Sequence, residues 1–163
     1  MIQSIDITIH INTPTQELSL LKDSQPIIIY PISSALNGLG EISGSQQTPR
    51  GWHQIRAKIG HNLPINSVFV GRRPTGEIFS LNLARRYPDR DWILTRILWL
   101  SGLELRFNRL GKCDTMRRYI YIHGCPDFEP MGIPKSHGCI RMRNHDVIDL
   151  FDHVQPFTRV LIE

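Results

Sequence analysis

The sequence predicts a mainly β fold, a sandwich or barrel of short strands with one or two short helices. Two observations support this prediction: segments of alternating hydrophobicity recur along the chain, and Pro, Gly and Asn residues separate them. The chain has 163 residues, of which 40% are hydrophobic and 21% are charged, values typical of one globular domain with its own core. We therefore expect a single domain over residues 1–163.

The N-terminal half is predicted to contain four strands. Residues 5–11 alternate strictly and residues 17–21 more loosely, and the proline-containing turn between them predicts a hairpin. Residues 27–32 and 51–59 are the next two strands. A loop rich in Gly, Ser and Gln, at residues 37–47, separates them.

The C-terminal half begins with a polar segment, residues 72–91, whose prolines and glycine predict a long excursion of the kind that covers a substrate site. Residues 93–100 are apolar enough for a buried strand or a short helix, and periodicity does not separate these. Residues 119–123 are predicted to form a strand because aromatic and β-branched residues favour it. A helix capped by Asn144 and running to Val154 follows, and the last strand is 159–162.

Charge and hydropathy exclude two classes of partner. The net charge of +4 is small and no run of basic residues marks a nucleic-acid arm, so we expect no nucleic-acid partner. No stretch reaches the roughly 20 apolar residues of a membrane span. The N-terminus MIQSIDITIHINT lacks the pattern of a secretory signal. We expect a cytoplasmic protein, or a periplasmic one if a signal has been removed.

The three cysteines, Cys113, Cys125 and Cys139, are an odd number in a chain too large to need a disulfide framework. At least one thiol is therefore expected to be free. A free thiol is either a buried structural group or a reactive one, and its neighbours decide which.

Two short segments place His and Cys beside glycines: YIYIHGCPD at residues 119–127 and SHGCIRM at residues 136–142. A thiolate attacks carbonyls, and a nearby imidazole lowers the thiol pKa and returns the proton to the leaving group. His123 and His137 are the candidate bases for Cys139. Gly138 leaves backbone N–H groups accessible to a developing oxyanion.

The segment SHGCIRM, preceded by IHG, resembles the signature of the L,D-transpeptidase catalytic domain family, and Thr48-Pro49-Arg50-Gly51 is similar to the family's TPxG turn. The resemblance implies a β-sandwich and a cysteine acyl transferase without metal or organic cofactor. It implies attack on the bond between meso-diaminopimelate and D-alanine in peptidoglycan stem tetrapeptides or muropeptides, and acylation by carbapenems. With water as acceptor the enzyme is an L,D-carboxypeptidase, and the expected cytoplasmic location favours this activity in peptidoglycan recycling. With an amine as acceptor it is an L,D-transpeptidase that forms peptidoglycan cross-links or attaches proteins to the wall.

By the same resemblance, Cys139 matches the nucleophile and His123 the general base. His137 and Gly138 flank the nucleophile, and their backbone, with the Cys139 N–H, resembles an oxyanion hole. Gly124 matches the position that orients the imidazole of the base.

Ser136 and Arg141 match supporting positions of the motif. The Arg141 guanidinium is a candidate to bind the carboxylate of the D-alanine leaving group. Cys125 departs from the pattern, since many members have a small polar residue there. It is either a buried structural thiol or, with a lowered pKa, the partner of Cys139 in a reversible disulfide.

Two alternatives from other classes remain. The pairs His123–Cys125 and His137–Cys139 offer two imidazoles and two thiolates to a structural zinc ion, although one intervening residue is an atypical spacing. A noncatalytic glycan- or peptide-binding module is the other alternative, against which the intact Cys139 and His123 argue.

Overall fold

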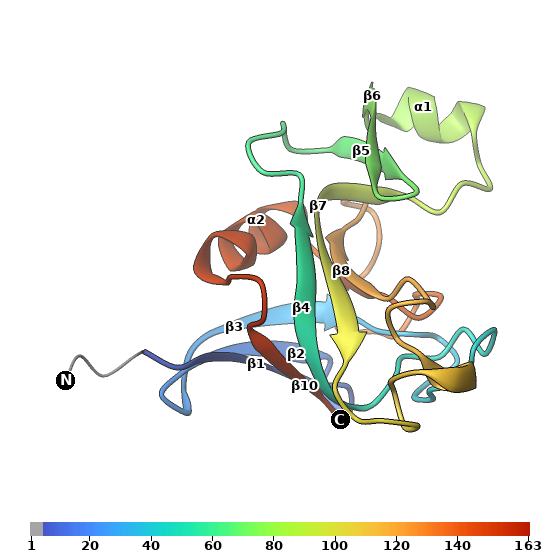
Figure 1. The fold of residues 1–163 in the computed structure, drawn as a ribbon. Helices are drawn as coiled ribbons and strands as arrows, with labels where there is room; N and C mark the ends of the chain where they lie inside the picture. The colour runs from blue at the N-terminus through green and yellow to red at the C-terminus, as the bar shows by residue number, and fades with distance from the viewer. Residues whose placement is uncertain (1–4) are drawn as a thin grey trace.

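The structure is a computed structural model that describes residues 5–163, and it is mainly β, as predicted (Figure 1). The expectation about a secretory signal rests partly on residues 1–4, which lie outside the described range. The strands are β1 Ile7–Asn12, β2 Glu17–Lys22, β3 Gln25–Ser33, β4 Gly51–Ile59, β5 Ser67–Val70, β6 Arg73–Ile78, β7 Ile93–Gly102, β8 Tyr121–Gly124, β9 Ile140–Met142 and β10 Arg159–Ile162. The helices are α1 Leu81–Arg86 and α2 Asn144–His153, with a 3-10 turn, η1, at Gly111–Cys113.

The strands form one sheet in the order β4-β10-β1-β2-β3-β9-β8-β7-β5-β6, and β4 also pairs with β7. This additional pairing closes the strands from β4 to β7 into a barrel-like sandwich, from which the β5–β6 hairpin projects at one end (Figure 1). A closed sheet leaves few unpaired edges. The predicted β-sandwich class is confirmed.

The barrel interior is filled by the residues that the alternation of the strands turns inward. Ile9 and Ile11 of β1, Leu18 and Leu20 of β2, and Ile55 of β4 are each at most 1% exposed. Burying an aliphatic side chain of this size stabilises the fold by about 1.5–3 kcal/mol. The alternation that predicted the strands is therefore the alternation that builds the core.

The apolar segment at residues 93–100, which periodicity left open between strand and helix, is the strand β7. It pairs with β4, β5 and β8, and α2 packs against it. Because neighbours cover both faces, most of its residues are buried and it shows no alternation. Tertiary packing, which sequence periodicity does not report, decides its type.

Two predictions need correction. The excursion at residues 72–91 is not irregular: it holds β6 and α1, and β6 pairs with β5, which was not predicted. The residues of β6 are mostly exposed and those of β5 are mostly buried, so neither strand shows a hydrophobic alternation. Asn144 is not the helix cap: α2 begins at Asn144 after Arg143, and the buried Asn144 side chain bonds to Thr95 of β7 and to the Cys125 backbone just after β8.

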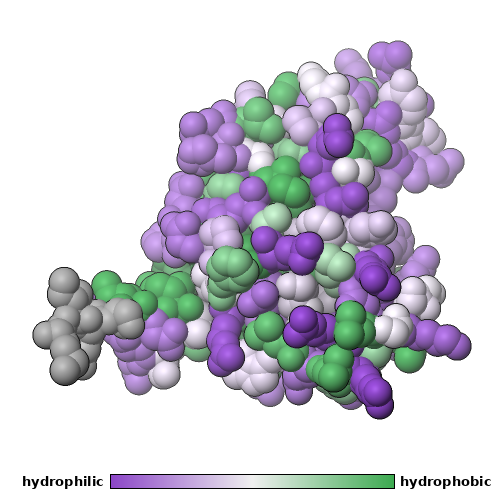
Figure 2. All heavy atoms as spheres, in the orientation of Figure 1, coloured by the Kyte–Doolittle hydropathy of each residue, from purple (hydrophilic) through white to green (hydrophobic). Residues whose placement is uncertain are grey.

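On the face shown in Figure 2, hydrophobic residues are interspersed among hydrophilic ones. None of the helices between residues 5 and 163 has the length and apolar character needed to cross a bilayer. A pocket lined by charged and polar side chains lies at the ends of β8 and β9.

Candidate active site

The two motif segments end on neighbouring strands. β8 and β9 run parallel, with Ile122 opposite Ile140 and His123 opposite Arg141. The side-chain alternation sends Ile122 and Ile140 into the barrel core and turns His123 and Arg141 to the opposite face, the face of Cys139. The sheet register therefore brings together residues that the chain separates by a long loop.

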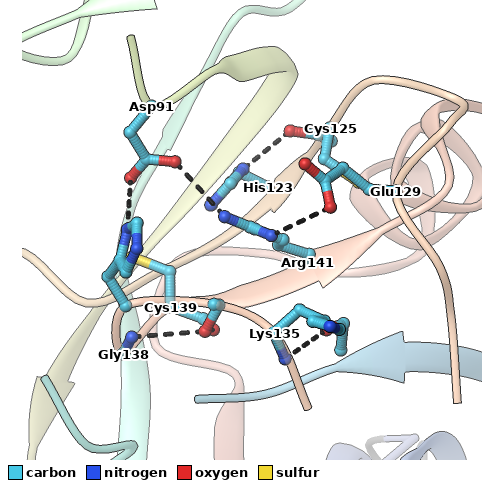
Figure 3. A network of polar contacts seen from close by, with 12 residues as sticks. Asp91, His123, Cys125, Glu129, Lys135, Gly138, Cys139 and Arg141 are labelled. Atoms are coloured by element: carbon cyan, nitrogen blue, oxygen red, sulfur yellow. Dashed lines mark hydrogen bonds and ion pairs between the residues drawn. The ribbon is translucent and has the colours of Figure 1, made fainter. Parts of the chain in front are cut away.

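His123 is held in one tautomer. Its Nδ1 atom lies 2.7 Å from the Gly124 carbonyl oxygen, which only accepts, so Nδ1 carries the proton and Nε2 is the free base (Figure 3). The side chain is 2% exposed, and this burial lowers the pKa of His123 below its usual value. The imidazole is therefore neutral and able to accept a proton at Nε2.

Cys139 rests as a neutral thiol. Its Sγ lies 3.4 Å from the Tyr119 carbonyl oxygen, to which the S–H donates, and 3.3 Å from the Tyr121 N–H. Burial of the sulfur raises the pKa of the Cys139 thiol to about 12, against the opposing effect of the Tyr121 N–H. The expected lowering of the thiol pKa by an imidazole is thus wrong for the resting protein, because desolvation disfavours both members of a thiolate–imidazolium pair.

The loop before Cys139 is shaped by Ser136 and Gly138. The Ser136 hydroxyl donates to the Cys139 carbonyl oxygen at 2.5 Å and accepts the Gly138 N–H at 3.2 Å. Gly138 has φ +130, and a β-carbon there would press on the Ile120 side chain and the Gln47 carbonyl oxygen. A residue with a side chain would distort this loop.

This arrangement determines which backbone N–H groups around the nucleophile are left without a protein acceptor. The Gly138 N–H is already bound to Ser136, whereas between residues 5 and 163 the N–H groups of His137 and Cys139 donate to no protein acceptor. These two are the donors left for a developing oxyanion.

The TPxG turn contacts this loop directly. The hydroxyl of Thr48, a fully buried residue, donates to the Gly138 carbonyl oxygen at 2.9 Å and accepts the Ala35 N–H at 3.0 Å. The sequence analysis used Thr48 only as part of a turn. Its role as a brace for the nucleophile loop follows from the fold.

Gly124, expected to orient the base, is packed tightly against the start of α2. A β-carbon at this position would overlap the Asn144 Oδ1 and the Leu94 carbonyl oxygen. Asn144 in turn donates to the Cys125 carbonyl oxygen at 2.8 Å, and its Oδ1 accepts the Thr95 hydroxyl at 2.6 Å. Asn144, predicted as a helix cap, thus ties β7 and α2 to the chain just after the base.

A charged network borders the thiol. Asp91, at the end of the 72–91 excursion, lies 3.4 Å from Arg141 and 3.6 Å from His137, and Glu129 lies 3.4 Å from the other Arg141 nitrogen (Figure 3). Arg141 is 8% exposed, so both carboxylates hold a largely desolvated guanidinium. His137 is on the exposed rim of the site. Asp91 and Glu129 were missed because no local motif marks them.

A pocket of about 410 Å³ joins these groups. It is lined by Cys139, His123, His137, Ser136 and Arg141 together with Gly71, Arg72, Asp91, Ile93, Arg118, Tyr119, Ile120 and Tyr121. Its lining includes three guanidinium groups and one carboxylate, so the pocket favours an anionic ligand. No local motif marks Arg72 or Arg118 as residues of a site, and the fold alone brings them to this pocket.

Cys125 is remote from the nucleophile. In the parallel register Gly124 pairs with Met142, so Cys125 lies past one end of the paired segment and Cys139 past the other. A separation of four residues along the strand corresponds to roughly 13 Å, far beyond the ~4.5 Å between β-carbons of a disulfide. Burial also raises the pKa of the Cys125 thiol to about 12, and not below its usual value as a redox partner would require.

The same geometry separates the proposed zinc ligands, since Cys125 is buried at one end of the paired strands and His137 is exposed beyond the other. Within residues 5–163 no three His, Cys, Asp or Glu side chains gather closely enough to hold a metal ion. The two His–Cys pairs do not form a tetrahedral set.

Comparison with known proteins gives the family. The family model described as the L,D-transpeptidase catalytic domain matches residues 6–162. Among solved structures, an L,D-transpeptidase from Mycobacterium smegmatis is 16% identical with a TM-score of 0.58, covering 98% of this chain and 59% of its own. An L,D-transpeptidase from Xylanimonas cellulosilytica is 19% identical with a TM-score of 0.57, covering 100% of this chain and 63% of its own.

L,D-transpeptidase 3 from Mycobacterium tuberculosis, in complex with a faropenem-derived adduct, is 15% identical with a TM-score of 0.59, covering 98% of this chain and 61% of its own. The chain thus spans less than two thirds of the length of these solved chains, and at such identities the likeness concerns the fold. No curated protein sequence matches the chain. The match of the family model over nearly the whole sequence shows that the chain belongs to the L,D-transpeptidase catalytic domain family.

Proposed function

We propose that this protein catalyses acyl transfer on peptidoglycan stem peptides, with Cys139 as nucleophile and His123 as general base. The observation that carries the proposal is the placement of a buried, tautomer-fixed imidazole and a thiol on one face of paired strands, in one pocket. Family membership supports a peptidoglycan stem peptide as the substrate class. Within that substrate we assign the reaction to the bond between the L-centre of meso-diaminopimelate and a terminal D-alanine.

In the first step the thiol sulfur attacks the diaminopimelate carbonyl carbon while its proton passes to Nε2 of His123. A C–S bond forms, the C–N bond to D-alanine breaks, and the imidazolium returns the proton to the leaving amine. The resting thiol bonds to the Tyr119 carbonyl rather than to the imidazole, so substrate must bring the two groups into engagement. Resting enzymes commonly show such looser geometry.

The developing oxyanion is assigned to the N–H groups of Cys139 and His137. Ser136 holds the intervening peptide, since its hydroxyl binds both the Gly138 N–H and the Cys139 carbonyl oxygen. Loss of one oxyanion donor costs about 10²–10³ in rate in well-studied cases. Gly124 supports the base through its carbonyl oxygen.

For the second step we propose water as the acceptor, which makes the protein an L,D-carboxypeptidase. Water adds to the thioester, the C–S bond breaks, and the sulfur regains its proton. The pocket volume of about 410 Å³ suits the end of one stem peptide, and water needs no binding surface of its own. An amine acceptor, as in a transpeptidase, is the alternative outcome of the same acyl-enzyme.

The test is to incubate the pure protein with a disaccharide tetrapeptide and weigh the products. Tripeptide plus D-alanine indicates hydrolysis, and a cross-linked dimer indicates transpeptidation. Cys139→Ala should abolish turnover, and His123→Gln should lower it by several orders of magnitude, while both keep the circular dichroism of the wild type. His137→Ala should cost less, because only its backbone is assigned a role. Full activity in Cys139→Ala would refute the assignment.

Two similar solved structures are L,D-transpeptidases in complex with imipenem and with a faropenem-derived adduct. We therefore propose that a carbapenem acylates this protein at Cys139. Peptide mapping should place the added mass on the peptide that contains Cys139, and an adduct on Cys113 or Cys125 would contradict the assigned nucleophile.

A further inference from the structure

The tip of the β5–β6 hairpin carries an arginine in an unusual backbone conformation. The two residues of the turn, Gly71 and Arg72, have φ +56 and +64, as a type I′ turn requires. Gly adopts this region freely, whereas a residue with a side chain does so at a cost of about 1 kcal/mol or more. Asn or Gly is the usual occupant of such a position, so an Arg here holds a strained conformation that its side-chain contacts must offset.

The Arg72 side chain is fixed over the pocket by aromatic residues. Its guanidinium lies 4.5 Å from the ring centre of Tyr119 and 4.9 Å from that of Trp99, and it donates to the Tyr121 hydroxyl at 3.0 Å. Stacking leaves the edge of a guanidinium free, and only one of its nitrogens is used by Tyr121. The group is therefore oriented before any ligand arrives.

Arg72 is also close to the nucleophile. The backbone N–H of Tyr121 contacts the Cys139 sulfur, and the hydroxyl of the same tyrosine contacts Arg72. The guanidinium therefore stands about one tyrosine side chain away from the thiol, in the same pocket. A stem-peptide carboxylate one residue from the scissile bond falls within that span.

The three guanidiniums of the pocket differ in what they already bind. Arg141 is paired with Asp91 and Glu129. Arg118 donates to the carbonyl oxygens of Gly40 and Gln47, at 3.2 and 2.6 Å. Within residues 5–163, Arg72 takes part in no ion pair.

We propose that Arg72 is the residue that binds a substrate carboxylate beside the scissile bond. The inference rests on the proposed function for the identity of the substrate. The carboxylate comes either from the terminal D-alanine or from the distal centre of diaminopimelate, since these two residues flank the scissile bond. Arg72 replaces Arg141 as the carboxylate receptor, because the two carboxylates on Arg141 would first have to be displaced.

The first experiment needs no turnover. Iodoacetate carries a carboxylate and iodoacetamide does not, so the ratio of their alkylation rates at Cys139, read by peptide mapping at pH 8.5, reports a cation near the thiol. Arg72→Gln should lower this ratio about tenfold, the lower end of the range for a charge-assisted hydrogen bond. Arg73→Gln, the neighbouring exposed hairpin residue outside the pocket, is the matched control and should leave the ratio unchanged.

The same ratio decides between the two arginines. Arg72→Lys keeps the charge and should retain much of the preference, and thermal unfolding confirms that each variant folds. A ratio that falls in Arg141→Gln but not in Arg72→Gln would overturn the proposal. So would a ratio that is unchanged in both.

The second experiment identifies the carboxylate. On a tetrapeptide, Arg72→Gln should lower kcat/KM by about 10- to 100-fold relative to wild type. The same comparison is made on two further substrates, one ending in D-alaninamide and one with the distal diaminopimelate carboxylate amidated. If Arg72→Gln and wild type have the same kcat/KM on one of these amides, the carboxylate missing from that amide is the one that Arg72 binds. If the variant loses the same factor on both amides, no carboxylate is involved and the proposal fails.

Failure of the proposed function has a different signature. In that case the wild type turns over none of the tetrapeptides, while the alkylation ratio still shows whether Arg72 recognises a carboxylate beside Cys139.

Discussion

The Thr48 hydroxyl and the Gly138 carbonyl oxygen are joined by a 2.9 Å hydrogen bond between a turn before β4 and the loop that carries the nucleophile. The same hydroxyl accepts the Ala35 N–H, and Thr48 is inaccessible to solvent. Each partner of this hydroxyl is therefore a backbone group without ready access to water, and both depend on one side chain.

Replacement of Thr48 by Val should lower the free energy of unfolding by roughly 1–3 kcal/mol, because the isosteric side chain leaves buried backbone groups unsatisfied. Carbapenem acylation of Cys139 should slow in the same variant, since the loop around Gly138 loses its brace. Thr48→Ser keeps the hydroxyl and is the matched control. Urea titration measures the stability and time-resolved mass spectrometry measures the acylation rate. If Thr48→Val and Thr48→Ser had the same stability and the same acylation rate, the hydroxyl would not have the role assigned to it.

The protonation state of Cys139 predicts a pH profile for its alkylation. Because burial raises the pKa of the Cys139 thiol to about 12, the thiolate fraction should grow through the whole neutral and alkaline range. The rate with iodoacetamide should rise by about tenfold per pH unit from about pH 7 to 10 without a plateau. Samples quenched at timed intervals and analysed by peptide mapping give the rate. Alkylation of the Cys113 peptide in the same digests shows that the reagent is active at each pH. A plateau in the neutral range would show that a thiolate–imidazolium pair exists before substrate binds.

The buried histidine His53 predicts acid sensitivity of the fold. Its Nδ1 donates to the Gly51 carbonyl oxygen and its Nε2 accepts the Thr115 hydroxyl, both at 3.0 Å, so it is buried as a neutral ring. Burial lowers the pKa of His53 from 6.5 to about 4. The unfolded chain therefore binds a proton between these values that the folded chain does not, and stability is lost as the pH falls through this window.

Over that window the wild type should lose ~3 kcal/mol of unfolding free energy through His53. His53→Gln lacks this proton linkage, so the gap in stability between variant and wild type should narrow by that amount from about pH 7 to pH 4. His123, whose pKa is also lowered, contributes equally to both proteins and cancels. Urea titrations at several pH values measure this difference in unfolding free energy. If the unfolding free energies of the two proteins changed in parallel with pH, the result would count against a neutral buried His53.

The separation of Cys125 from Cys139 along the paired strands predicts that no disulfide joins them. After mild peroxide, wild type and Cys125→Ser should lose activity, and regain it with reductant, to the same extent. Non-reducing peptide mapping should find no linked pair of peptides in the folded protein. A Cys125–Cys139 linked peptide would show that the β8–β9 register is not the one described.

The sequence by itself determined the strand alternation of the N-terminal half and the helix after Arg143, and it pointed to the two residues to which we assign the proposed chemistry. These are local properties: alternation indicates which face of a strand is buried, and a cysteine flanked by His and Gly in a short motif indicates a nucleophile. The type of β7 was left open because a strand covered on both faces by β-neighbours and α2 has no alternation. β6 was not predicted because its residues are largely exposed, and the short β5 was not predicted because its residues are mostly buried and so show no alternation.

Only the tertiary structure decided the partners of the motif residues. The parallel register of β8 and β9 sets His123 beside Arg141 and removes Cys125 from the thiol, and the closed sheet delivers Thr48 to Gly138. Asp91 and Arg72 reach the pocket from the excursion and the hairpin. The pKa values of the thiol and the imidazole likewise follow from desolvation, which depends on everything packed around them and is encoded in no single motif.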